Sequence, residues 1–285
     1  MLQTTLFKNR IAVLGTRHHK EKVISPIIEQ NLGLKVIVPN DFNTDVFGTF
    51  TREVKRIGTQ LEAARLKAEK ALDITGETIA LASEGTFAPH PSFPFVSCNR
   101  EVVILLDTLH DIEIIGQYFS TETNHSYKII TSFQEAYDFA MSVGFPEHGL
   151  IVMIESPSQD KGDIIKGITT KEQLFEAVTF AIKKAGKAHI ETDMRALYNP
   201  TRMKNIEKAT HDLIQKINQV CPQCSCPGFD VIERKKGLPC AYCHLPTALT
   251  RSAIYQCKKC GFSQERLFPD GWEKADPSQC NYCNP

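Results

Sequence analysis

The sequence lacks several features that define whole classes of protein. It has no excess of either charge, because 33 lysine and arginine residues balance 33 aspartate and glutamate residues. That balance gives no global attraction to nucleic acid or to an anionic membrane. No apolar run approaches the roughly 20 residues of a membrane span, and the N-terminus lacks the long apolar core of a signal peptide. We therefore expect a cytoplasmic protein without a membrane partner, whose thiols stay reduced or bind metal.

The cysteines, by contrast, are unevenly distributed. Nine of the ten lie between Cys221 and Cys283, and Cys98 is the exception. The chain of 285 residues is long enough for one sizeable α/β domain with a small appendage. The change in composition near residue 220 therefore predicts an α/β domain over residues 1–219 and a small cysteine-rich domain over residues 220–285.

The cysteine-rich segment contains four Cys-x-x-Cys pairs. Two thiolates three positions apart on a tight turn bind one ion, and two such turns complete a tetrahedron. Few apolar residues lie nearby, so metal must replace the missing core. Disulfides and redox pairs are the alternatives, but the regular spacing and the lack of an export signal favour two structural Zn²⁺ ions. The expected ligands are Cys221, Cys224, Cys240, Cys243, Cys257, Cys260, Cys280 and Cys283.

The sequence does not fix how the four pairs combine. Fifteen residues separate the first pair from the second, and nineteen separate the third from the fourth, which suits two sequential zinc ribbons. A crossed arrangement stays open, because Cys243 and Cys257 are also at a plausible spacing. We predict the sequential arrangement. Cys226 and His244 are adjacent spare ligands, which we expect to stay outside both sites.

The first half of the α/β domain alternates strands and helices. This order implies parallel strands joined by right-handed crossovers. The elements are a strand at 11–14, a helix around 23–28, a strand at 35–38, a helix over 51–72 and a strand at 78–82.

The second half of the domain adds a hairpin and further helices. We therefore predict a mixed, mainly parallel sheet flanked by helices. The elements are a hairpin of 101–106 with 112–116, a strand at 127–130, a helix over 132–143, a strand at 149–154, a helix over 171–185, and a helix from Pro200 to Gln219 with Asn199 as its cap.

A candidate ligand site lies where the strand at 78–82 stops. The apolar run ends at Ser83-Glu84-Gly85, which we interpret as a turn. In α/β folds the carboxyl ends of buried strands carry the ligand sites. Glu84 would stand at that edge, and Gly85 would let the backbone approach a neighbouring group closely.

Two upstream segments supply basic residues. Thr16, His18, His19 and Lys20 follow the first strand and precede a helix, where basic side chains and helix N–H groups form a phosphate site. Lys67 lies on the long helix, five positions after Glu62. The two side chains are about 140° apart around the helix, so both reach one cleft only from its edges.

The order of these segments resembles the nucleotide pyrophosphatases of the inosine/xanthosine triphosphatase class and the related Maf-type enzymes. The similarity rests on Lys20 in the first turn, Gly48-Thr49 in the second loop, Glu62 and Lys67 in the helix, and the acidic-Gly turn at Glu84. The chain departs from that pattern at Ala63, where those enzymes have Asn. It also has Ser83-Glu84-Gly85 in place of Asp-Asp-Ser-Gly, which leaves one carboxylate fewer.

This resemblance implies an inosine triphosphatase-like fold and a metal-dependent hydrolase of nucleoside triphosphates. Glu62 and Glu84 would hold Mg²⁺ or Mn²⁺, which activates water. Lys20 and Lys67, with Arg52 or Arg56, would offset the phosphate charge, and His90 would act as a general acid or base. Glu191, Asp193, Arg195 and Arg202 would close over the nucleotide.

The segments Ser83–Pro91 and Glu191–Arg195 are not signatures of the pyrophosphatases. They resemble instead an uncharacterised bacterial family with an N-terminal α/β domain and a C-terminal double zinc ribbon. That resemblance covers the whole chain but implies no activity.

These observations support three hypotheses. The first is a metal-dependent nucleotide-phosphate hydrolase, or a nucleotide binder derived from one, fused to zinc ribbons. The second is a non-catalytic adaptor that binds nucleic acid or protein through its ribbons. The third is an enzyme of other chemistry that uses His18, His90 and Glu84 on a different phosphorylated substrate. Convergence of Lys20, Glu62, Lys67 and Glu84 on one cleft would favour the first.

Overall fold

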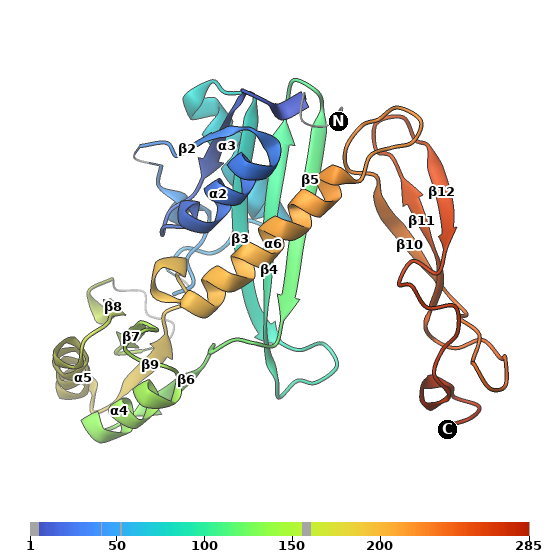
Figure 1. Ribbon diagram of the computed structural model, residues 1–285. Helices are drawn as coiled ribbons and strands as arrows, with labels where there is room; N and C mark the ends of the chain where they lie inside the picture. Colours follow the sequence, from blue (N-terminus) through green and yellow to red (C-terminus); the bar gives the residue numbers. More distant parts are fainter. Residues whose placement is uncertain (1–5, 41, 52, 156–160, 285) are drawn as a thin grey trace. The chain divides into compact units, whose positions relative to one another are not determined.

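The computed structural model describes residues 6–40, 42–51, 53–155 and 161–284 (Figure 1). The chain divides into two compact units, one ending at Ile214 and the other beginning at Gln215. The boundary that we predicted after residue 219 lies just inside the second unit. Among the described residues, no helix has both the length and the apolar character needed to cross a membrane.

A five-stranded sheet in the order β2-β1-β3-β4-β5 forms the centre of the first unit. The pairings of β1 with β2 and β3 are parallel, whereas β3 with β4 and β4 with β5 are antiparallel. The sheet is therefore mixed, but the prediction of a mainly parallel sheet is wrong, because the chain returns from β3 as a hairpin instead of crossing through a helix. The strands are β1 (Ile11–Gly15), β2 (Lys35–Ile37), β3 (Ile79–Pro89), β4 (Ser97–Asp107) and β5 (Ile112–Ser120).

Helix α3 (Gln60–Thr75) covers one face of this sheet with small side chains. Ala64, Ala68 and Ala71 pack in one buried cluster with strand residues of β1, β3 and β4. The helix begins later than the predicted Thr51, because Thr59 and Glu62 form a capping box at its start. The short 3-10 helix η1 (Thr44–Phe47) precedes it.

Two further helices accompany the large sheet of the first unit, namely α2 (Glu21–Leu32) and α6 (Pro200–Asn218). In Figure 1, α6 crosses over β3, β4 and β5. Gly116 of β5 lies directly against Ala209 and Leu213, so a side chain at this position would collide with the helix. The predicted cap of α6 is confirmed, because the Arg202 backbone N–H donates to Asn199 Oδ1 at 2.9 Å.

A second sheet, in the order β6-β9-β7-β8, is antiparallel throughout. Helices α4 and α5 pack on it around an apolar core that includes Phe139, Leu150, Leu174 and Ile190. Strand β9 was not among the predicted elements. The elements are β6 (Tyr127–Ile130), α4 (Phe133–Ser142), β7 (Leu150–Met153), η2 (Lys161–Asp163), β8 (Ile164–Ile168), α5 (Lys171–Ala185), β9 (Ala188–Thr192) and η3 (Ala196–Tyr198).

The second unit is built on a three-stranded antiparallel sheet in the order β10-β11-β12. Its small core contains Phe229 and two cysteines, Cys221 and Cys257. The elements are β10 (Asp230–Lys236), β11 (Thr250–Gln256), β12 (Ser263–Leu267) and the 3-10 helix η4 (Pro277–Gln279).

Candidate functional site

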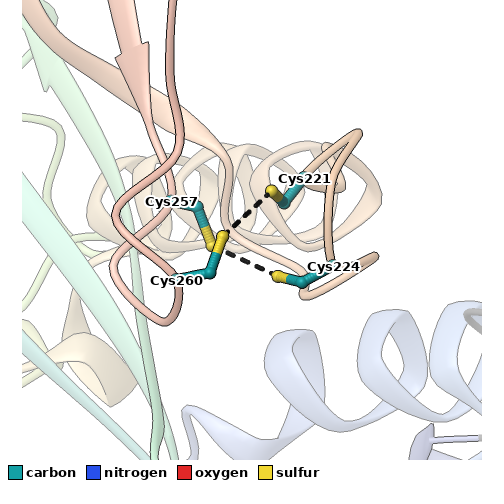
Figure 2. Close-up of side chains that lie close together, drawn as sticks. All are labelled: Cys221, Cys224, Cys257 and Cys260. Carbon is teal, nitrogen blue, oxygen red and sulfur yellow. Dashed lines mark hydrogen bonds between the residues drawn. The ribbon is translucent and has the colours of Figure 1, made fainter.

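The eight predicted cysteine ligands form two groups of four. In each group one Sγ atom from every cysteine lies within 4.8 Å of the others. Figure 2 shows the first group, in which Cys221 and Cys260 are 3.6 Å apart, as are Cys224 and Cys257. Four sulfurs at about 2.3 Å from a zinc ion would be about 3.8 Å from one another, whereas disulfide sulfurs are about 2.05 Å apart. The donor set therefore fits tetrahedral Zn²⁺ and not disulfides.

The sequential pairing is wrong, because the groups are interleaved. Cys221 and Cys224 join the third pair, and the second pair joins the fourth, Cys280 and Cys283. The strands explain this. β10 leads from the first pair to the second, and β11 returns antiparallel from the second pair to the third. Seven residues of strand span about 23 Å, so consecutive pairs lie at opposite ends of the sheet.

The thiols of each group need a cation. In the second group, the backbone N–H of Cys243 lowers the pKa of Cys240 to about 7. The thiol of Cys243, in turn, raises the pKa of Cys283 to about 12. Without a cation, four adjacent sulfurs cannot all carry charge, whereas a zinc ion stabilises all four thiolates. Cys226 and His244 belong to neither group, as expected.

In the first unit, β3 continues past the end of β1. The parallel pairing of these strands ends at Gly15 and Ala82. The predicted turn at Ser83-Glu84-Gly85 is therefore wrong, since these residues continue the strand and pair with β4. Beyond this point no strand of the described part of the chain lies beside β3 on the β1 side, and side chains from the loop before α2 approach it there.

Lys20, just before α2, is one of the buried basic residues at this edge. Its Nζ atom donates to the carbonyl oxygen and to the hydroxyl of Ser83, at 3.1 and 3.0 Å. Burial, followed by the charges of Arg202 and Lys67, lowers the pKa of Lys20 from 10.5 to about 7. Among the described residues, no carboxylate lies within ion-pair distance of Lys20.

Glu84 holds the neighbouring cations in place. Its carboxylate accepts from Lys67 Nζ at 2.7 Å and lies 3.3 Å from Arg56 Nε. Burial alone would raise the pKa of Glu84, but Lys67 and Lys20 lower it below its usual value. Glu84 is therefore an ionised partner in a buried ion pair.

Three other cations at this edge also have carboxylate partners. Arg195 contacts Asp193 at 2.6 Å, Arg202 contacts Glu101 at 2.8 Å, and Lys166 contacts Glu53. Each pair fixes a positive group in one orientation, and Arg202 is almost completely buried. The pairs differ in this respect from Lys20, whose hydrogen bonds go to neutral oxygens.

The basic side chains at this edge line a cavity of about 70 Å³, called the phosphate cavity below after the ligand that we propose for it. Six of its lining residues are basic and only Glu84 is acidic. A second cavity, of about 570 Å³, shares Gly48, Thr49, Phe50 and Glu84 with it. The basic lining residues of the first are Arg17, Lys20, Lys67, Lys166, Arg195 and Arg202.

The structure brings together most of the residues predicted for the α/β site. Glu191 lines the larger cavity, and Asp193 lies behind the phosphate cavity as the partner of Arg195. Nine predicted residues line the phosphate cavity itself: Thr16, His18, Lys20, Thr49, Lys67, Ser83, Glu84, Arg195 and Arg202.

Glu62 does not line the phosphate cavity, because its carboxylate accepts a hydrogen bond from the backbone N–H of Thr59 at 2.6 Å. It is exposed at the start of α3 and lines neither cavity. Glu62 and Glu84 therefore do not converge on one metal ion. The sequence Thr59-x-x-Glu62 is the signal for this cap.

Four further predicted residues are placed elsewhere or not described. His19 is exposed beside Glu21, and His90 packs against Phe93 and Phe119 in the hairpin between β3 and β4. Gly85 packs closely against the Glu101–Arg202 pair and lines neither cavity. Arg52 lies outside the described residues.

Sequence reasoning missed several residues of the two cavities. Lys166 comes from β8 of the second sheet, and no spacing links it to Lys20. Phe87 and His125 stack in the larger cavity with ring centroids 5.5 Å apart. The predicted turn puts Phe87 in a loop, whereas it lies in β3.

The geometry thus defines an α/β protein with a cation-lined cavity and a second unit carrying two Cys₄ groups. The chain belongs to the family described as a domain of unknown function (DUF6671), whose model matches residues 67–285. The matched part includes both Cys₄ groups, whereas Lys20 precedes it. A comparison with curated proteins gave no match. The resemblance to nucleotide pyrophosphatases has no test in these comparisons and stays a prediction.

Proposed function

We propose that the first unit binds a phosphorylated small molecule, with the phosphoryl group in the phosphate cavity. The observation that carries the proposal is Lys20, a buried amine that hydrogen-bonds to neutral oxygens and has no carboxylate within ion-pair distance among the described residues. A buried ammonium group is costly unless an opposite charge compensates it. A phosphate would supply that charge and accept several hydrogen bonds at once.

The other cations support the same ligand class. Lys67, Arg195 and Arg202 are held by carboxylates in fixed orientations, so little side-chain entropy is lost when an anion binds. The Gly15–Lys20 loop leads into α2, and the first N–H groups of a helix favour an anion. A buried, preorganised cluster of cations is suited to phosphate recognition.

Hydrolysis through Mg²⁺ or Mn²⁺ is not part of this proposal. Glu62 caps α3, and Glu84 is engaged by Lys67 and Arg56. Among the residues described, the groups that could hold a metal ion consist of cysteines alone. We propose that these two groups bind Zn²⁺ and serve to fold the second unit.

The adaptor hypothesis has less support. Arg234 contacts Asp270 at 2.8 Å, and Lys235 contacts Glu265 at 3.4 Å. Paired charges of this kind do not make a contiguous basic face, which nucleic acid would require.

Titration calorimetry with inorganic phosphate tests the proposal. We expect one phosphate per chain, and we expect Lys20→Met to weaken binding by about tenfold or more, because a hydrogen bond to a charged group contributes about 1.5–3 kcal/mol. Lys22→Met is the matched control, since Lys22 lies two positions away and is exposed. Absence of phosphate binding, or equal losses in both variants, would contradict the proposal.

A further inference from the structure

The size of the phosphate cavity limits what it can hold. A water-sized group needs about 10–15 Å³ of such volume, so the roughly 70 Å³ has room for about five atoms of that size. One phosphate group has about five heavy atoms, whereas a triphosphate chain has roughly thirteen, and at this size per atom only the single phosphate fits. The cavity therefore matches the size of one phosphoryl group, and a triphosphate chain would have to extend beyond it.

The larger cavity differs in both size and charge. Its volume of about 570 Å³ lies within the range of about 300–1,000 Å³ that small-molecule sites occupy. Lys55 and Arg56 are its basic lining residues, and Glu84 and Glu191 are its acidic ones. This balance gives no reason for further phosphates to enter it.

Aromatic side chains form one wall of the larger cavity. Phe50 meets Phe87 edge to face at 5.6 Å, and Phe87 stacks with His125. Phe50 also lines the phosphate cavity and lies over the guanidinium of Arg202, at 4.6 Å. A ligand whose phosphate is held beside Arg202 would therefore extend along this wall.

We propose that the ligand is a monophosphate ester that carries a flat heteroaromatic ring, of the nucleoside 5′-monophosphate class. Its single phosphate occupies the phosphate cavity, and its ring packs against Phe50, Phe87 and His125 in the larger cavity. This inference rests on the proposed phosphate site and adds the ring and the limit of one phosphate. Ser126, Thr192 and Glu191 line the same cavity.

The test compares the affinities of inorganic phosphate, ribose 5-phosphate, adenosine and uridine 5′-monophosphates, and adenosine triphosphate, measured by calorimetry on the zinc-loaded full chain. Stacking of a base on an aromatic side chain contributes about 1–3 kcal/mol. At least one nucleoside monophosphate should therefore bind about tenfold more tightly than ribose 5-phosphate. The triphosphate should bind no more tightly than the monophosphate.

Phe87→Leu should remove most of that tenfold difference, and the nucleoside monophosphate and ribose 5-phosphate are compared within this variant because the Phe87 ring also lies 5.7 Å from the guanidinium of Arg202. Phe95→Leu makes the same change at an exposed position and should alter neither affinity. Tyr127→Leu, on the rim of the larger cavity, is the second variant if Phe87→Leu lowers the melting temperature.

Two outcomes separate the inferences. If phosphate and ribose 5-phosphate bind but neither nucleoside monophosphate binds more tightly than ribose 5-phosphate, the proposed binding of a heteroaromatic ring is refuted and the proposed phosphate site stands. If the triphosphate binds more tightly than the monophosphate, the limit of one phosphate is refuted. If no phosphate compound binds, the proposed function itself fails.

Discussion

Binding of phosphate should be coupled to uptake of a proton by Lys20. In the free protein its pKa is lowered to about 7, so at pH 7.5 roughly three-quarters of the molecules carry a neutral amine. A phosphate dianion beside Lys20 favours the ammonium form and raises this pKa. Each binding event at pH 7.5 should then take up about three-quarters of a proton from the buffer.

The direction of the pH dependence follows from the same shift. Above pH 7 the free site must gain a proton before it binds, so affinity should fall as pH rises, approaching tenfold per pH unit. Below about pH 6 the ligand becomes a monoanion, because the second pKa of a phosphate ester is about 6. Affinity should therefore be highest between about pH 6 and pH 7.

Calorimetry with a phosphate monoester such as ribose 5-phosphate, in buffers with different heats of ionisation, measures the proton uptake directly, because the ester is largely a dianion at pH 7.5. In Lys20→Met the uptake at pH 7.5 should disappear, and affinity should no longer fall between pH 7 and pH 9. Lys22→Met should retain both effects. Proton uptake that persists in Lys20→Met would refute the assignment of the titrating group to Lys20, and its absence in the unaltered protein would refute the argument from burial.

Two further sets of variants test the ion pairs and the metal groups. Glu84→Gln should lower the free energy of unfolding by about 3 kcal/mol or more in chemical denaturation, because it leaves a buried cation unpaired. Glu62→Gln should change the free energy of unfolding little and the phosphate affinity not at all. Equal effects of the two variants would contradict the assigned roles. Zinc content by atomic absorption should be about two ions per chain. Cys224→Ser combined with Cys257→Ser should remove one ion, and Cys224→Ser combined with Cys243→Ser should remove both; the opposite result would restore the sequential pairing.

Local signals in the sequence predicted the positions of helices and strands better than they predicted how the strands pair. The range of α5 and the cap of α6 depend on residues close together in the chain. The antiparallel pairing of β3 with β4 joins two consecutive strands, but the polar Ser83-Glu84 in mid-strand hid it. Because these two side chains are satisfied by Lys20 and Lys67, a polar stretch can continue a buried strand.

Some residues of the candidate site could be predicted from the sequence, and others could not. Lys20, Lys67, Glu84 and Arg202 were predicted from their charge and their order along the chain, and all four line the phosphate cavity. Glu62 was misinterpreted because a carboxylate in the first turn of a helix serves a cap as readily as a metal. The burial that sets the charge of Lys20 depends on the whole fold and has no counterpart in local spacing.

The interleaved cysteines have a consequence for synthesis of the chain. When the nascent polypeptide has emerged only as far as Cys243, it holds two complete pairs but no complete group of four, because the partners of Cys221 and Cys224 come after β11. The first ion can be enclosed only once Cys260 is available, and the second only once Cys283 has followed. The ions therefore cannot stabilise an early fragment, and metal uptake reports that the antiparallel sheet has formed.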